Sequence, residues 1–543
     1  MISAHPSRRS GAAVLAASLL TLTAALAPPL AAQEHAPPEG DHVLGDVEFP
    51  TSCAPAAQQE FQRGVAMLHS FWFGAARQAF QAAAAADADC AMAHWGMAMT
   101  LLGNPMARSA PSADNVAAGL EHARQAVRLA EDASPREQGY AAAAVLLYQD
   151  ADRLDHFARM ARYEDAMRAL SEAYPDDDEA AIFHALAVVA NAPPSDLTFA
   201  RQLHGASILE PIFERRPNHP GLAHYIIHAY DAPPIAEQGL DAARRYAGIA
   251  PSAPHALHMP SHIFTRLGYW EESAETNARS AEAEENPRGR YHPWDYMVYA
   301  WLQQGKDRAA RQIVDEAVRL EREAIAANPE GYTRSVIAYN LVAMPARFAL
   351  ERDAWAEAMA LEVLPGSGPF AEAVTVFARG IGHGREGHAA PAAAEADRLD
   401  ALRAELEAAN DGYWSTVVGA QALAVRSWAA HAAGETDRAL ELAREAAELE
   451  ETVEKHPVTP GPILPARELY AEMLLLEGRA ADALVQAERT LEREPNRART
   501  TAIAARAAEA AGEAERAAMY RAELEELMAH ADGTRGEWQG VSP

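Results

Sequence analysis

The sequence has little of what a β-sheet protein or a nucleic-acid-binding protein needs. Aromatic residues make up 7% of its 543 residues, and Val and Ile are sparse, whereas alanine is the commonest residue along most of the chain. Such a composition favours helices packed through small contacts and predicts an all-α fold. Basic residues are also few, because 47 Lys and Arg stand against 77 Asp and Glu, a formal net charge of −30. This balance excludes a nucleic-acid binder that works through a basic surface.

Familiar catalytic signatures are missing as well. The sequence has no Gly-x-Ser-x-Gly nucleophile elbow and no Gly-x4-Gly-Lys-Ser/Thr phosphate loop, and its only lysines are Lys306 and Lys455. Motifs of this kind therefore assign no catalytic residue and leave open whether the protein is an enzyme.

Long apolar runs are absent beyond the N-terminus. Residues 11–27 form an uncharged run of 17 residues rich in Ala and Leu, preceded by two arginines and followed by small residues up to Ala32. The run is shorter than the roughly 20 residues that span a bilayer, so it favours a secretory signal peptide at residues 1–32 over a membrane anchor. We expect export to the periplasm or the extracellular space, no membrane span in the mature chain, and a disordered leader at residues 33–54.

Cysteine is scarce, with two residues in the whole chain. In an oxidising compartment an even number of cysteines is what a disulfide requires. Cys53 stands before one predicted helix and Cys90 before the next but one, so alternate helices lying side by side would bring the two together. A bridge would stabilise the chain by about 3 to 4 kcal/mol through loop-closure entropy. Two buried free thiols and a soft metal site are the alternatives.

A short turn recurs in which a small residue follows a glycine by five positions, between two amphipathic stretches. The pairs are Gly268 with Ser273, Gly305 with Ala310, Gly434 with Ala439, Gly478 with Ala483 and Gly512 with Ala517. We expect each glycine to end a helix in the left-handed conformation and each small residue to let the next helix approach closely. Gly478 and Gly512 are 34 residues apart, a spacing typical of helical repeat proteins.

The repeats resemble the tetratricopeptide repeat (TPR) family. Residues 61–83, with Ala76 and Phe80, and residues 471–495 carry its small–aromatic–small signature, and the resemblance covers most of residues 55–530 in patches. It implies a TPR-like right-handed superhelical solenoid of about ten helix pairs. The concave groove of such a solenoid holds a peptide or a partner protein segment. Together with the signal peptide, the resemblance points to an exported bacterial TPR-like protein.

Loops divide the array into parts. We expect an N-terminal array with a histidine-rich groove at residues 55–360, an irregular helical connection at 361–410, C-terminal repeats at 411–530 and a disordered tail at 531–543. Residues 456–465 hold four prolines and are predicted to form a loop.

Histidines gather in the middle of the chain. His224 with His228 and His258 with His262 have the i, i+4 spacing that places two imidazoles on one helix face. Corresponding members are 34 residues apart, so the pairs occupy equivalent positions on neighbouring first helices. The axes of such helices lie roughly 8 to 10 Å apart, within reach of one shared ion. Because imidazole suits zinc and copper, the sequence predicts a metal site at these four histidines, with divalent Zn or Cu.

The same register places more polar side chains on the groove. Counted from the repeat turns, the expected groove-lining residues are His255, His292, Asp295 and Tyr299. Asp295 is then a fourth ligand or supports the ligands from outside. A polar peptide-binding groove and a structural hydrogen-bond network are the alternatives to a metal. The Glu of His-Glu-x-x-His is missing, so a metalloprotease mechanism is not supported.

Two functions are compatible with these features. The first is an exported binding or scaffold protein whose groove carries the histidine-rich metal site. The second is a metal-dependent enzyme in which the same histidines bind Zn or Cu and Asp295, His292 or Tyr299 transfers protons. Binding is favoured, because no motif places an acid or a base.

Overall fold

The computed structural model describes residues 42–327 and 337–532, and within these ranges the chain forms helices, turns and irregular segments without a β-strand. The predicted all-α class is confirmed. The expected signal peptide lies outside the described residues, as do residues 33–41 of the leader and residues 533–543 of the tail.

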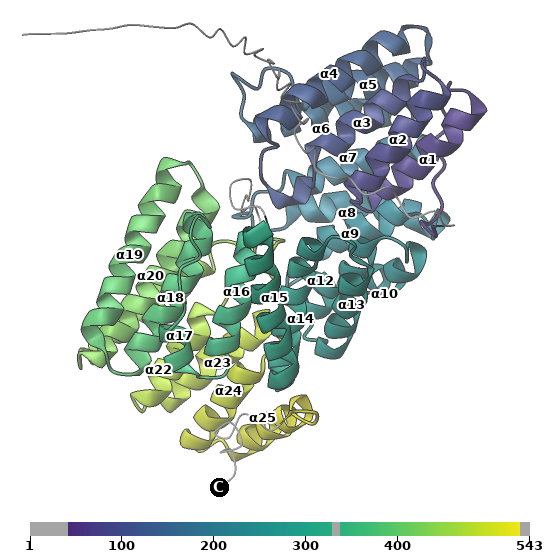
Figure 1. Ribbon diagram of the computed structural model, residues 1–543. Coiled ribbons are helices and arrows are strands. Elements are labelled where there is room, and N and C mark those ends of the chain that lie inside the picture. Colours follow the sequence, from purple (N-terminus) through teal and green to yellow (C-terminus); the bar gives the residue numbers. More distant parts are fainter. Residues whose placement is uncertain (1–41, 328–336, 533–543) are drawn as a thin grey trace, which may run out of the picture. The chain divides into compact units, whose positions relative to one another are not determined.

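Consecutive helices are joined mostly by short turns and pack alongside one another (Figure 1). The N-terminal helices are α1 (Pro55–His69), α2 (Phe73–Ala86), α3 (Ala91–Leu102), α4 (Ala113–Leu129), α5 (Pro135–Leu146), α6 (His156–Ala173), α7 (Asp178–Ala190) and α8 (Ala200–Arg215). The middle helices are α9 (Pro220–Tyr230), α10 (Leu240–Ile249), α11 (Pro254–His258), α12 (Pro260–Arg266), α13 (Trp270–Ala283), α14 (Tyr291–Gln303), α15 (Asp307–Ala327) and α16 (Ile337–Leu350). The C-terminal helices are α17 (Trp355–Met359), α18 (Pro369–Arg385), α19 (Ala389–Ala408), α20 (Gly412–Ala432), α21 (Thr436–Glu450), α22 (Ala466–Leu476), α23 (Ala480–Arg493), α24 (Ala498–Ala510) and α25 (Ala514–Leu527).

The repeated turns adopt the predicted conformation. Their five glycines have φ between +66° and +81°, the left-handed region that ends a helix. The small residue five positions later is buried in every case: Ser273, Ala310, Ala439, Ala483 and Ala517. Alternate helices such as α1 and α3, or α22 and α24, also touch, as a stack of helix pairs requires. The chain is therefore a helical repeat array of the TPR-like kind.

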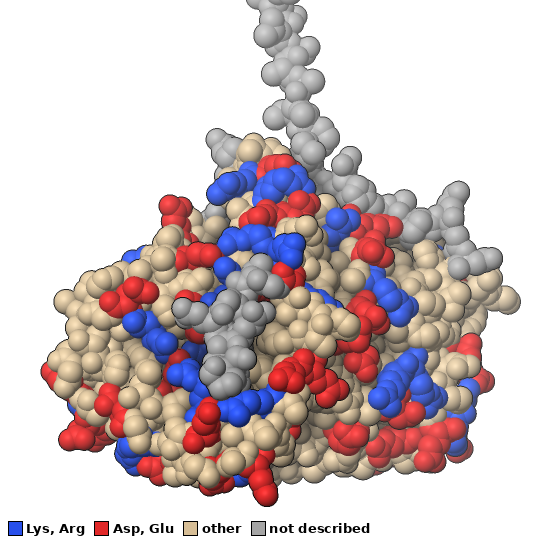
Figure 2. Space-filling view, turned by 90° about the horizontal axis from the view of Figure 1, so that it is seen from below, with Lys and Arg blue, Asp and Glu red and all other residues tan. Residues whose placement is uncertain are grey.

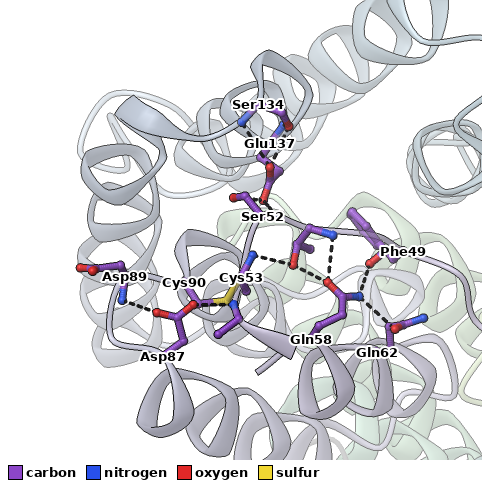
Figure 3. Close-up of a disulfide and its surroundings, with 12 residues drawn as sticks. Phe49, Ser52, Cys53, Gln58, Gln62, Asp87, Asp89, Cys90, Ser134 and Glu137 are labelled. Carbon is purple, nitrogen blue, oxygen red and sulfur yellow. Dashed lines mark hydrogen bonds between the residues drawn. A yellow bond between two sulfur atoms is a disulfide. The ribbon is translucent and has the colours of Figure 1, made fainter. Parts of the chain in front are cut away.

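The predicted disulfide between Cys53 and Cys90 is confirmed (Figure 3). Cys53 lies just before α1 and Cys90 is the residue before α3, so the bond joins the starts of two alternate helices. Asp87 strengthens the same junction, because its carboxylate accepts a hydrogen bond of 2.7 Å from the backbone N–H of Ala54.

We predict that reduction of this disulfide lowers the free energy of unfolding of the first repeats by about 3 to 4 kcal/mol, because the bridge closes a long loop in the unfolded chain. Repeats contact mainly their neighbours, so α18–α25 should be nearly unaffected. Hydrogen exchange with and without reductant measures both regions. Faster exchange spread equally over the whole array, or free thiol in the unreduced protein, would contradict this.

Residues 42–54 differ from the disordered leader expected for residues 33–54. Phe49 is fully buried and packs against Phe61, Trp95 and Tyr140 with ring centroids 4.8 to 5.6 Å apart. The expectation of disorder is wrong here, because the polar and proline-containing composition concealed one aromatic residue that completes the first core.

Residues 361–410 also differ from the irregular connection expected for them. Most of them form α18 and α19, two regular helices that pack together. Gly380 and Gly384 lie inside α18, where a Cβ on Gly380 would come within 2.5 Å of Val425 and one on Gly384 within 2.5 Å of Trp428. These glycines serve close contact with α20 rather than ending the helix.

The predicted loop at residues 456–465 belongs to an irregular stretch that contacts helices far away in the sequence. We call residues 454–465 the inner segment. Tyr296 of α14 donates its hydroxyl to the carbonyl oxygen of Thr459 at 3.0 Å, and the Arg347 guanidinium of α16 donates to the carbonyl oxygen of Gly461 at 2.5 Å. These donors satisfy backbone groups that helix or sheet would otherwise satisfy.

We predict that the inner segment makes stability dependent on pH through His456. Burial and the nearby Arg108 and Lys455 charges lower the pKa of His456 to about 3. Below about pH 6.5 the unfolded chain therefore binds a proton at His456 that the folded chain does not bind. The contribution of His456 to the free energy of unfolding is complete above that pH and is lost as the pH falls toward 3. Urea unfolding measures the free energy of unfolding across this pH range. It should depend less steeply on pH in His456→Asn than in the unaltered protein. Identical slopes would contradict the assignment.

Charges on the surface do not gather into one patch on the face drawn in Figure 2, where acidic and basic side chains are interspersed. Many exposed ion pairs join residues one helical turn apart, such as Arg319 with Glu323 at 2.6 Å and Arg403 with Glu407 at 2.8 Å. Water and salt screen such exposed pairs, so each contributes little to stability. None of the described helices is long and apolar enough to cross a membrane.

Candidate metal centre

Six histidines come together from three neighbouring helix pairs. In chain order they are His224 and His228 on α9, His255 and His258 on α11, His262 on α12 and His292 on α14. Pro260 begins α12, yet Met259 before it keeps helical angles of φ −54° and ψ −35°. One helical face therefore continues across the proline.

These histidines form two groups of three, each with its potential ligand atoms within 4.8 Å of one another. Group A is His224, His228 and His255. Group B is His258, His262 and His292. The sequence placed the two His-x-x-x-His pairs around one shared ion. In the structure each pair instead gains a third histidine from the next helix pair along the chain, so His255 and His292 are candidate ligands and not only groove-lining residues.

Hydrogen bonds fix the orientation of three of the imidazoles. The Nδ1 of His224 lies 2.6 Å from the backbone oxygen of His69. The Nδ1 of His258 lies 2.6 Å from Oδ1 of Asn277, and the Nδ1 of His262 lies 2.8 Å from a carboxylate oxygen of Asp231. Each of these oxygens accepts a hydrogen, so Nδ1 carries the proton and Nε2 is left with a free lone pair. This is the arrangement that supporting groups give to metal-binding histidines.

His258 and His262 face each other through Nε2 atoms that are 2.9 Å apart. Because both protons are on Nδ1, two lone pairs point at each other, and a shared cation is what makes this contact favourable. Burial lowers the pKa of His258 to about 4, so at neutral pH a proton is a poor candidate for that cation. A metal ion fits the residues.

Each group also contains a buried nitrogen without a hydrogen-bond partner. These atoms are Nε2 of His228 in group A and Nδ1 of His292 in group B. A buried polar atom left unsatisfied costs about 1 to 3 kcal/mol, so it requires an explanation. A metal ion at each group would supply one for both atoms.

All six imidazoles are held neutral, which is the form that ligates. Desolvation by burial is the largest cause and lowers the pKa of every one of them, and repulsion from neighbouring histidines adds to it in five. Neutral imidazole without carboxylate ligands suits Zn, Cu or Ni rather than Mg or Ca.

Asp295 and Tyr299 do not line an open groove as predicted. Asp295 is fully buried, its carboxylate lies 3.3 Å from Nε of Arg347, and burial raises its pKa to about 6. Tyr299 is also fully buried and accepts a hydrogen bond of 2.9 Å from Arg497. Arginines from distant parts of the chain cover this part of α14. Neither residue bonds to a histidine of either group.

Four further residues around the groups were not predicted from the sequence. They are Asp231, Asn277, Tyr296 and Lys455. Lys455 of the inner segment forms a buried ion pair with Asp231, with Nζ 2.7 Å from the carboxylate oxygen that also meets His262. Asp231 follows His228 by three residues, so its helix position was a usable signal. Tyr296 likewise follows His292 by four residues on α14, whereas Asn277 and Lys455 reach the site only through folding and left no local pattern.

A third cluster of possible ligands, His69, Glu179 and His219, lies beside group A and is joined by hydrogen bonds, although Nδ1 of His219 has no partner. The two carboxylate oxygens of Glu179 lie 2.9 Å from Nε2 of His69 and 3.0 Å from Nε2 of His219, and the ion pairs hold the pKa of Glu179 low. The other nitrogen of His69 meets the Tyr225 hydroxyl at 2.9 Å. A Cβ on Gly221 would come within 2.5 Å of His69, so glycine there admits the ring. The cluster ties α1, α7 and α9 together and fixes the carbonyl that orients His224.

We predict that Glu179→Gln lowers the free energy of unfolding by about 3 kcal/mol, because an amide cannot accept from both imidazoles and the pair is buried. Metal content should stay unchanged at saturating metal. Glu60→Gln removes a partly exposed partner of Arg63 and serves as the matched control, with an effect within about 0.5 kcal/mol. Chemical denaturation measures both, and equal effects of the two variants would contradict the structural role.

No family model and no curated protein matches this chain. Among solved structures it is similar to Naa15/Naa10 bound to HypK-THB, at 12% identity and a TM-score of 0.24, over 88% of this chain and 64% of that one. It is also similar to a monomeric mutant of IFIT1 with Gppp-AAAA, at 12% identity and a TM-score of 0.33, over 80% of this chain and 90% of that one. A third is the TPR domain of P58(IPK), at 12% identity and a TM-score of 0.20, over 84% of this chain and 99% of that one. All three scores lie below 0.5, so they do not indicate what this chain binds. Its own geometry defines it as an all-α, TPR-like array of helix pairs that carries two three-histidine groups.

Proposed function

We propose that this protein is an exported helical scaffold that binds two transition-metal ions, Zn or Cu, one in group A and one in group B. The observation that carries the proposal is the contact between Nε2 of His258 and Nε2 of His262, 2.9 Å apart with both Nδ1 atoms already hydrogen-bonded to oxygens. The unpartnered nitrogens of His228 and His292 support it independently.

Three imidazoles around each ion leave room for a further ligand. Zinc sites with three protein ligands keep a fourth position for water or substrate, with metal–nitrogen bonds of about 2.0 to 2.1 Å. The open position is what favours the alternative of a metal-dependent enzyme. Asp295 and Tyr299 do not serve as its proton-transfer groups, because Arg347 and Arg497 engage them.

Export is supported by the apolar N-terminal run with its flanking arginines, and by the disulfide, which forms and persists in oxidising compartments. A peptide partner in the groove is a weaker proposal. The inner segment already bonds to Tyr296 and Arg347, so an external peptide would have to displace it there.

We predict that the purified protein, stripped with a chelator and then titrated with Zn(II) or Cu(I), binds two ions per chain. His224→Ala and His258→Ala should each bind one ion fewer, because each removes a ligand from a different group. Bound metal after desalting is measured by elemental analysis, and circular dichroism checks that the variants keep their helices.

His431→Ala is the matched control, since His431 lies in α20 and pairs with Glu477 instead of with either group. It should bind two ions like the unaltered protein. A folded wild-type protein that retains no metal, or His258→Ala with unchanged metal content, would contradict the proposal.

A further inference from the structure

The two groups are contiguous. Ring centroids of His228 and His262 are 5.9 Å apart, and so are those of His255 and His258, although each pair joins group A to group B. Within group B the centroids of His262 and His292 are 6.1 Å apart. The other centroid distances within the groups are shorter, 4.4 to 4.9 Å. The two groups are therefore distinct, but they lie side by side and the six rings form one contiguous cluster.

One turn of helix supplies ligands to both groups. His255 and His258 are three residues apart on α11, a spacing that puts Cβ atoms about 5 to 6 Å apart on one face. His255 belongs to group A and His258 to group B. Ions held by neighbouring side chains of a single turn lie near each other, which is the geometry of a dinuclear centre.

The charges around the cluster favour ions of low charge. None of the six candidate ligands is a carboxylate. The carboxylate of Asp231 is hydrogen-bonded to His262, but Lys455 at 2.7 Å already neutralises its charge. Burying uncompensated charge is costly, and two divalent ions would bring four positive charges into this site. Two Cu(I) ions bring two, and imidazole suits copper.

A pocket of about 80 Å³ reaches the cluster at His228, whose Nε2 has no partner. Asp231, Lys455 and Tyr413 are also in its wall. The volume exceeds what one water molecule needs, so a diatomic molecule has room beside the ligand.

Resting on the proposed function, we propose that groups A and B form a single dinuclear copper centre that takes Cu(I) and binds dioxygen between its two ions. Three imidazoles leave each ion an open position, and the contiguity of the groups lets both positions meet one small ligand. In the step, each Cu(I) gives up one electron, dioxygen accepts both and becomes peroxide, and two copper–oxygen bonds form. No proton moves, and no other reactant is needed.

The test loads the full protein with two equivalents of Cu(I) without air and then adds dioxygen. We expect uptake of one dioxygen for every two coppers. We also expect the oxidised protein to show almost no electron paramagnetic resonance signal, because the two Cu(II) spins couple. Two bound coppers that give the full signal of isolated Cu(II), or that take up no dioxygen, overturn the dinuclear centre and leave the metal-binding function in place. A protein that retains no copper overturns the copper centre, and one that retains neither copper nor zinc overturns the metal-binding function as well.

His228→Ala separates the roles of the two groups. It removes one ligand of group A at the pocket, so it should lose dioxygen uptake while the copper of group B stays bound. His431→Ala should take up dioxygen like the unaltered protein. Helical circular dichroism shows that each variant is folded, and undiminished uptake by folded His228→Ala overturns the proposal.

Discussion

Close contact between neighbouring helix pairs is the constraint on which the rest of this structure depends. Small residues five positions after each turn glycine are buried, which lets the helices approach. Where consecutive repeats have the same length, as around the histidine pairs, they stack so that equivalent side chains meet. A histidine pair on α9 and its counterpart on α11 and α12, 34 residues later, therefore become neighbours in space. Burial in this packing keeps the imidazoles neutral, the form that can bind a metal ion.

The inner segment closes the histidine cluster from the other side. It lies on α12, α14 and α16 through carbonyl oxygens, and it brings Lys455 to Asp231. The chain's own inner segment therefore occupies the Tyr296 and Arg347 donors that an external peptide would otherwise meet there. The Glu179 cluster acts similarly beneath group A, where it fixes the His69 carbonyl that orients His224. The site is thus supported by hydrogen bonds from several directions.

Local and periodic features were predictable from the sequence. The helix class, the left-handed turn glycines, the disulfide and the two histidine pairs all follow from short-range spacing or repeat register. His255 and His292, the third members of the two groups, were predicted only as groove-lining residues, because repeat register alone does not say which imidazoles converge. Tyr299 and Asp295 were predicted on the groove but are buried under Arg497 and Arg347. These contacts join residues far apart in the chain, so no local pattern in the sequence indicated them. Composition gave the wrong prediction of disorder for residues 42–54, because the burial of one residue, Phe49, holds this segment on the core.

The central claim is that the six histidines hold two ions rather than one or none. Anomalous diffraction at the copper edge, from crystals of the copper-loaded protein, tests it most directly. The account predicts two peaks, one among His224, His228 and His255 and one among His258, His262 and His292. A single peak shared by the two His-x-x-x-His pairs, or no peak near any of these imidazoles in protein that carries copper, would contradict it.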